Sequence, residues 1–187
     1  MSVLTICPDS EPSKTQVFED PDAISDRLGD IGVVFERWEA SLPLSEESEE
    51  AEVLAAYADS VERLKRKYGF QSADVINIGP DHPDKAVLRK KFLSEHVHTD
   101  FEVRFFVGGR GLFFLHVGEH VYAVLCEQGD LISVPAHTRH WFDMGAEPEL
   151  KCIRLFTTPE GWVAQYTGDK IAASFPGMEQ FLASHSA

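Results

Sequence analysis

From residue 95 onward the chain is a succession of short, mostly apolar segments separated by glycine-containing turns. Turn signals such as Gly118-Glu119 and Gln128-Gly129-Asp130 divide these segments. Regular short strands with turns of this kind are typical of a β-sandwich or a β-barrel. The expected strands are 101–107, 111–117, 120–126, 130–135, 139–144 and 150–156, with a break at 108–111. The sequence therefore predicts a mainly β core.

The first 94 residues mix helices with a few strands. Asp20-Pro21 predicts the start of a helix and Gly29 its end. Ser45 is expected to open the longest helix, which ends at Gly69. Its apolar face recurs at helical spacing through Val53, Tyr57, Val61, Leu64 and Tyr68. Further elements are expected at 33–38, 75–78, 84–93 and 176–184.

We therefore predict an α+β chain of mainly β character, with several helices flanking a β-sandwich or β-barrel. Its 187 residues suit one domain over 1–187. Within it we expect an N-terminal layer of helices and strands, a barrel core and a C-terminal segment, over 1–94, 95–158 and 159–187 respectively.

Charge and cysteine content exclude several classes of function. The formal net charge of −14 repels phosphate backbones, so nucleic acid is not an expected partner. The acidic run over 46–52 is interpreted as a solvated helix start. Three cysteines without a CxxC motif argue against a disulfide framework and suit the cytoplasm. The sequence has neither a signal peptide pattern nor a run of 18 apolar residues, so no membrane association is expected. We expect a monomer.

The segment from His96 to Glu102 carries the strongest chemical signal. His96 and His98 are two apart, so in an extended strand both side chains point to one face. Glu102 and Arg104 keep the same parity. Charged and imidazole groups facing a barrel interior are costly unless something pairs them, and a divalent first-row metal would do so. The alternative is two exposed histidines on an edge strand beside an ordinary surface glutamate.

A second segment, Gly129 to His140, runs from a turn through a strand to Pro135 and a further histidine. His140 is expected to enter the next strand and to supply a further metal ligand. His137 is a rival, although its place two residues after Pro135 puts it in the loop.

Together these two segments resemble the cupin motifs. The first is His96-Val97-His98, Glu102 and Gly109, and the second is Gly129, Pro135 and His140. The resemblance implies a β-barrel that binds a metal through His96, His98, Glu102 and His140. Two positions depart from the common cupin pattern, because His137 stands where many cupins have glycine and Met144 where many have asparagine.

Within the cupins the chain most resembles the bacterial acireductone dioxygenases of methionine salvage. The resemblance rests on FEVRFFVGGRGLFF, VPAHTRHWFDMG and RLFTTPEGWVAQYTG, and it is strong over about residues 92–168. It implies one Fe(2+) or Ni(2+) per chain and two small-molecule substrates, an enediol and O2. Iron would give formate and the keto-acid precursor of methionine, and nickel would give carbon monoxide, formate and a methylthio acid.

Further residues are expected near the metal. Arg104 shares the predicted face of Glu102 and would pair with an anionic substrate, unless it forms a structural salt bridge. Arg154 is a weaker candidate of the same type. Phe92, Phe142 and Trp162 are candidate apolar walls of the substrate pocket, with core packing as the alternative. His116 and His120 lie in or beside a predicted hairpin turn and are expected at the surface.

Two other functions fit the same ligand pattern. One is a different cupin enzyme, of the oxalate- or flavonol-oxidising type. The other is a non-enzymatic barrel that stores or senses metal, which would have a closed coordination sphere without an open position.

Overall fold

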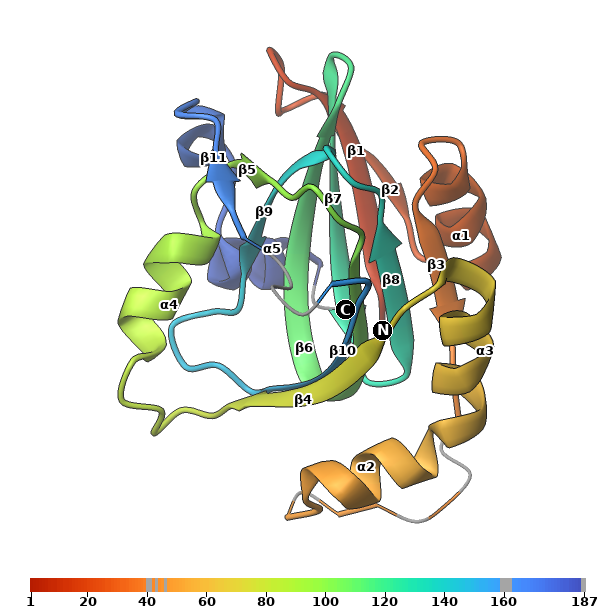
Figure 1. The fold of residues 1–187 in the computed structure, drawn as a ribbon. Coiled ribbons are helices and arrows are strands. Elements are labelled where there is room, and N and C mark those ends of the chain that lie inside the picture. The colour runs from red at the N-terminus through yellow and green to blue at the C-terminus, as the bar shows by residue number, and fades with distance from the viewer. Residues whose placement is uncertain (40–41, 43, 46, 159–162, 186–187) are drawn as a thin grey trace.

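One long strand, β6 (Glu102–Val117), organises the fold (Figure 1). The computed structural model describes residues 1–39, 42, 44–45, 47–158 and 163–185. The first half of β6 pairs with β8 (Asp130–Val134) and β10 (Leu150–Phe156), and its second half pairs with β7 (His120–Glu127) and β9 (Arg139–Asp143). The predicted break at 108–111 is therefore wrong, since the two expected strands are one.

Gly109 explains how a single strand can serve both halves. Its φ is 70°, a conformation that glycine adopts without steric cost. A Cβ atom there would lie 1.6 Å from the carbonyl oxygen of Glu149. The facing strand shifts register between Lys151 and Cys152, as at a β-bulge. The chain bends here instead of turning back, so the glycine pattern marks a corner.

The remaining strands extend these two halves by antiparallel pairing. On one side the order runs β11-β5-β9-β6-β7-β1-β2, and on the other β3 pairs β8 and β4 pairs β10. The N-terminal strand β1 was not expected from the sequence. The bounds are β1 (Val3–Pro8), β2 (Gln16–Phe18), β3 (Val34–Arg37), β4 (Ser72–Ile78), β5 (His96–Val97) and β11 (Gln165–Tyr166).

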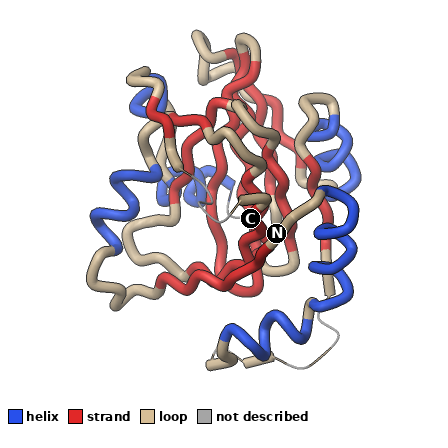
Figure 2. The backbone as a smooth tube through the Cα atoms, in the orientation of Figure 1, coloured by secondary structure: helices blue, strands red, loops and turns tan. Residues whose placement is uncertain are grey.

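Helices surround the strands at the periphery (Figure 2). They are α1 (Pro21–Gly29), α2 (Glu50–Ala56), α3 (Ala58–Tyr68), α4 (Lys85–Phe92), the 3-10 turn η1 (Ile171–Ser174) and α5 (Met178–His185). In the described part of the chain, none of them is long and apolar enough to cross a bilayer.

Two predicted helix boundaries are corrected. The helix expected from Ser45 is two helices that meet at Tyr57, whose φ of −114° interrupts the helical path. Its first part begins at Glu50, and the preceding N-cap residue Glu49 forms a capping box with Glu52. The predicted end at Gly69 is confirmed by its left-handed φ of 77°. Gly29, by contrast, is the last helical residue of α1 and does not follow its end.

The apolar core divides according to the two faces of β6. Phe106, Phe113 and Leu115 face the barrel interior with residues of β1, β7 and β8. Val103 and Phe105 face α2 and α3 on the outside. Leu112 and Phe114 pack against α5. Because Glu102 and Arg104 alternate with Val103 and Phe105, they point inward. The predicted mainly β fold with flanking helices is confirmed.

Candidate metal centre

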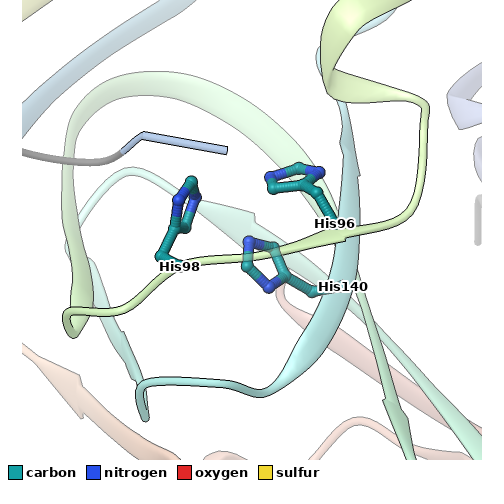
Figure 3. A group of neighbouring side chains, drawn as sticks. All are labelled: His96, His98 and His140. Carbon is teal, nitrogen blue, oxygen red and sulfur yellow. The ribbon is translucent and has the colours of Figure 1, made fainter. Parts of the chain in front are cut away.

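Three histidines, two on neighbouring strands and one just after the first of these strands, lie close together (Figure 3). His96 on β5 pairs in register with His140 on β9, and their ring centroids are 4.4 Å apart. His98 follows directly after β5, with its ring centroid 4.9 Å from that of His96. One ring nitrogen of each histidine lies within 4.8 Å of the others, and all three side chains are buried.

Glu102 reaches the same point by a different path from the one expected. The sequence prediction assumed one straight strand from His96 to Arg104, but the chain bends between β5 and β6. Asp100 holds this bend by accepting hydrogen bonds from the backbone nitrogens of Phe101 (2.7 Å) and Thr157 (3.1 Å). Glu102 Oε2 then lies 2.8 Å from His140 Nε2 and 3.5 Å from His98 Nε2.

Backbone carbonyls fix which nitrogen of each ring carries hydrogen. The Nδ1 atoms of His96 and His140 lie 2.7 Å from the carbonyl oxygens of Ser94 and Thr138, respectively. His98 Nδ1 lies 3.2 Å from the Val163 carbonyl oxygen. A carbonyl can only accept, so each Nδ1 donates, and in a neutral ring the Nε2 lone pair is left for the site.

The charge states favour a cation between these groups. Burial, together with the nearby His140 ring, lowers the pKa of His96 to about 4, so this ring is neutral at pH 7. Burial alone would raise the pKa of Glu102, but the charge of Arg104 and the facing rings of His140 and His98 hold it well below its ordinary value. The site therefore presents the neutral imidazole of His96 beside the ionised carboxylate of Glu102.

This donor set fits a divalent transition metal. Within the described residues, the buried atoms Glu102 Oε2 and His140 Nε2 have no hydrogen-bond partner, although they lie 2.8 Å apart. Two acceptors at that distance repel each other unless a proton or a cation lies between them. Ligands about 2.1 Å from an ion are roughly 3 Å apart when they meet at right angles. Imidazole suits iron, nickel, copper and zinc.

His137, the rival ligand, is placed differently. It lies in the loop before β9 with a φ of 63°, and its side chain is exposed. Its backbone nitrogen donates to the carbonyl oxygen of His98 at 2.8 Å. His137 thus contacts the site through its backbone, whereas the ring that joins the group belongs to His140.

Arg104 lies beside the histidine group and contacts Glu102 directly. Its Nε donates to Glu102 Oε1 at 2.8 Å, and its side chain is almost fully buried. The guanidinium carbon lies 4.6 Å from the ring centroid of Phe142, and 5.6 Å from those of Phe92 and Phe113. These contacts hold a positive charge in one orientation next to the site.

A cavity of ≈ 560 Å³ opens beside the histidines. His96, His98, Arg104 and Phe92 are among the residues that line it, and Phe142 packs behind Arg104 in the core. Arg154 also lines the cavity, but it forms a two-point ion pair with Asp74 on β4, with bonds of 2.8 and 2.6 Å. Trp162 lies outside the described residues.

Sequence reasoning missed a group of buried polar residues behind the site. His116 was expected at the surface, but it is 6% exposed and bonds to Glu95, which is 1% exposed. Glu95 directly precedes His96, and that adjacency was the one available signal. Tyr166, which lines the cavity beside His96, was also missed.

Comparisons with known proteins identify the family of the chain. The sequence model of the ARD/ARD' family matches residues 5–164. The chain is 64% identical to the acireductone dioxygenase of Methylococcus capsulatus, over 97% of this chain and 98% of that protein. It is 55% identical to the acireductone dioxygenase of Pseudomonas aeruginosa, over 96% and 99% of the two chains.

A solved structure gives the same result. The acireductone dioxygenase from Bacillus anthracis, described with a cadmium ion in its active centre, superposes with a TM-score of 0.79 at 34% identity. The match covers 89% of this chain and 98% of that one. The expected cupin-type barrel is thereby confirmed. With its paired histidine strands, its inward-facing glutamate and these relatives, the chain belongs to the acireductone dioxygenase family.

Proposed function

We propose that this protein is a metal-dependent acireductone dioxygenase that cleaves 1,2-dihydroxy-3-keto-5-methylthiopentene with O2 in methionine salvage. The observation that carries the proposal is the juxtaposition of three imidazoles, one carboxylate and a cavity that also contains Arg104. The relatives that share most of the chain bear the same activity in their names.

The proposed ligands are His96, His98, Glu102 and His140, which would hold one Fe(2+) or Ni(2+) per chain. Their fit rests on the Nε2 lone pairs and the carboxylate oxygen that face one another. When bound, the metal would supply a Lewis acid that holds the two oxygens of an enediolate and makes its reaction with O2 possible.

The proposed role of Arg104 is to bind the anionic oxygens of the substrate. It is always charged, and its stacking on Phe92 and Phe142 fixes the direction of its N–H groups. An ordered cation in a poorly solvated pocket stabilises an anion more strongly than water does. The cavity of ≈ 560 Å³ falls in the range of small-molecule sites, and its apolar lining residues such as Phe92 and Phe156 would exclude water from the anion.

The two metals separate the proposed activity from other cupin oxidations. The iron form is proposed to give formate and 4-methylthio-2-oxobutanoate, and the nickel form carbon monoxide, formate and 3-methylthiopropionate. The same protein ligands serve both forms, so the difference would arise from which oxygens of the substrate are held and which carbons remain open to O2.

The test is to reconstitute metal-free protein separately with iron and with nickel, supply acireductone and O2, and assay the headspace for carbon monoxide. Carbon monoxide from the nickel form alone, with keto acid from the iron form alone, would support the proposal. Identical products from both metals, or no turnover by either, would refute it and leave another cupin oxidase or a metal-storage barrel. A monomeric state and a cytoplasmic location are part of the proposal, and gel filtration with cell fractionation tests them.

A further inference from the structure

A group of buried polar side chains lies directly behind the candidate metal centre. Glu95 precedes His96, and its side chain is 0% exposed. One carboxylate oxygen accepts a hydrogen bond from His116 Nδ1 and the other from Thr167 Oγ1, both at 2.7 Å. A buried carboxylate is costly unless its oxygens are paired, so these two bonds hold Glu95 in one position.

His116 connects this carboxylate to the second strand of the site. It lies on β6 in register with Arg139, and its Nε2 is 3.4 Å from Arg139 Nη2. Leu115, the neighbour of His116, faces the interior and pairs with His140. Because successive side chains of a strand point to opposite faces, His116 lies behind the site. It thus lies between Glu95 and Arg139, the residues that immediately precede two of the histidines.

Thr167 also holds the segment that contains Glu95 and His96. Its backbone nitrogen donates to the carbonyl oxygen of Glu95 at 3.1 Å. Thr167 follows directly after β11, whose Tyr166 pairs in register with His96 and lines the cavity. The bonds of Glu95 therefore hold both the backbone of His96 and one wall of the cavity.

The orientation of the His96 ring depends on this same segment. His96 Nδ1 donates to the carbonyl oxygen of Ser94 at 2.7 Å, and Glu95 lies between these two residues. A displacement of Glu95 would move that carbonyl and rotate the ring that it orients. Groups that hold the non-ligating nitrogen of a metal-bound histidine typically change metal affinity about 10- to 100-fold when they are lost.

We infer that Glu95 is a positioning residue for the metal centre, which orients His96 and anchors the β11 wall through its bonds to His116 and Thr167. This inference rests on the proposed function, since it requires a metal at the histidine group.

The test uses Co(2+) as a probe that can be followed without turnover. Glu95→Gln keeps the side-chain volume but replaces one accepting oxygen with a donating amide, so it cannot accept from both partners. Thr167→Val removes no charge, but it removes the hydroxyl that donates to the Glu95 carboxylate at 2.7 Å, together with that hydroxyl's longer bonds to the Glu95 carbonyl oxygen (3.4 Å) and from the Asp169 backbone nitrogen (3.2 Å). The Co(2+) dissociation constant is measured by chelator competition, and the ligand field is followed by the visible absorption spectrum of the bound ion.

A matched control is Asp130→Asn. Asp130 is also 0% exposed, accepts from the Ser2 hydroxyl and pairs with Arg37. Asp130 is the first residue of β8, whereas Val134, which pairs with Glu102, is the last. The control is expected to lower thermal stability while leaving the Co(2+) affinity and spectrum unchanged.

For Glu95→Gln we expect a Co(2+) dissociation constant raised about 10- to 100-fold and a shifted spectrum, with a smaller change in the same direction for Thr167→Val. Wild-type affinity and spectrum in both variants, or equal changes in Asp130→Asn, would overturn the inference alone. If Glu95→Gln does not fold, Thr167→Val decides the matter by the same readouts. Wild-type protein that binds Co(2+) no better than His140→Ala would overturn the proposed function as well.

Discussion

Replacement of Arg104 by methionine separates metal binding from turnover. Arg104 donates to Glu102 at 2.8 Å, and both side chains are nearly fully buried. Two unit charges about 4 Å apart, at an effective dielectric constant near 20, attract by about 4 kcal/mol. Removal of one partner of such a buried pair typically costs about 3–5 kcal/mol, because the other charge is left uncompensated.

The size of this cost should depend on whether a metal is bound. In the metal-free protein Arg104 and the neighbouring rings of His140 and His98 offset the charge of Glu102, so Arg104→Met should lower the free energy of unfolding by about 3–5 kcal/mol. A bound divalent cation would replace the missing charge. We therefore expect metal loading to restore most of the lost stability, and metal content to stay near that of the wild type.

Turnover should respond differently, because the metal cannot replace the contact between Arg104 and the substrate anion. A loss of about 2–5 kcal/mol in transition-state binding corresponds to a decrease in kcat/KM of roughly 30-fold to several thousand-fold. Arg154→Met is the matched control: it removes a cavity arginine whose ion pair with Asp74 is partly exposed and screened by solvent, so its cost in stability should be smaller than that of Arg104→Met. Denaturation of metal-free and loaded protein, elemental analysis and steady-state kinetics give the three readouts.

Two results would refute this reasoning. Full activity of Arg104→Met would exclude the arginine from substrate binding. An unchanged stability of the metal-free variant would show that the ion pair with Glu102 is not the interaction that the distance implies.

Three further predictions concern the ligands, the pH dependence and the bend in β6. His140→Ala should lose bound metal while His137→Ala keeps it, as measured by elemental analysis; the opposite result would reverse the ligand assignment. Burial tends to raise the pKa of Asp143, but its bonds to Arg89 and to backbone nitrogens lower it below the usual value. The ionised Asp143 therefore stabilises the fold above its unfolded pKa, near 4, and this stabilisation is lost as the pH falls through the lower pKa of the folded state. Asp143→Asn should accordingly make the free energy of unfolding depend less on pH in the acid range. Gly109→Ala should destabilise the protein by more than about 2 kcal/mol in thermal unfolding, because its Cβ would overlap the facing backbone carbonyl and its φ is positive; a melting temperature equal to that of the wild type would contradict this.

Local patterns predicted the parts of the fold that depend on local structure. The strand ends near Gly118 and Gly129 and the helix end at Gly69 follow from backbone conformations that glycine adopts easily. The bend in β6 was misread because Gly108-Gly109 has the composition of a turn. Only the facing strand, with its register shift at Lys151, shows that the chain continues.

The alternation of side chains along the predicted strand placed some of the site residues correctly and others for the wrong reason. The prediction that Glu102 and Arg104 point to the same face of one strand is correct, since both belong to β6 and point inward. The parity from His98 to Glu102 does not hold, because the chain bends in between, and Glu102 returns to the site through the pairing of β6 with β8. His116 and Glu95 are 21 positions apart and meet through the sheet, so no short motif could reveal that they are paired.

In the proposed site, the metal ligands and the substrate-binding arginine are held by two different kinds of interaction. His96 and His140 are held opposite each other by a backbone ladder, whose spacing is fixed by hydrogen bonds and not by side-chain packing. Arg104, by contrast, is held by aromatic rings and by one carboxylate. Changes to the ladder or to the bonds behind it should therefore act on metal affinity, whereas changes to the aromatic contacts of Arg104 should act on turnover. Because Glu102 faces His140 at 2.8 Å and also accepts from Arg104, its loss should impair metal affinity and turnover at once.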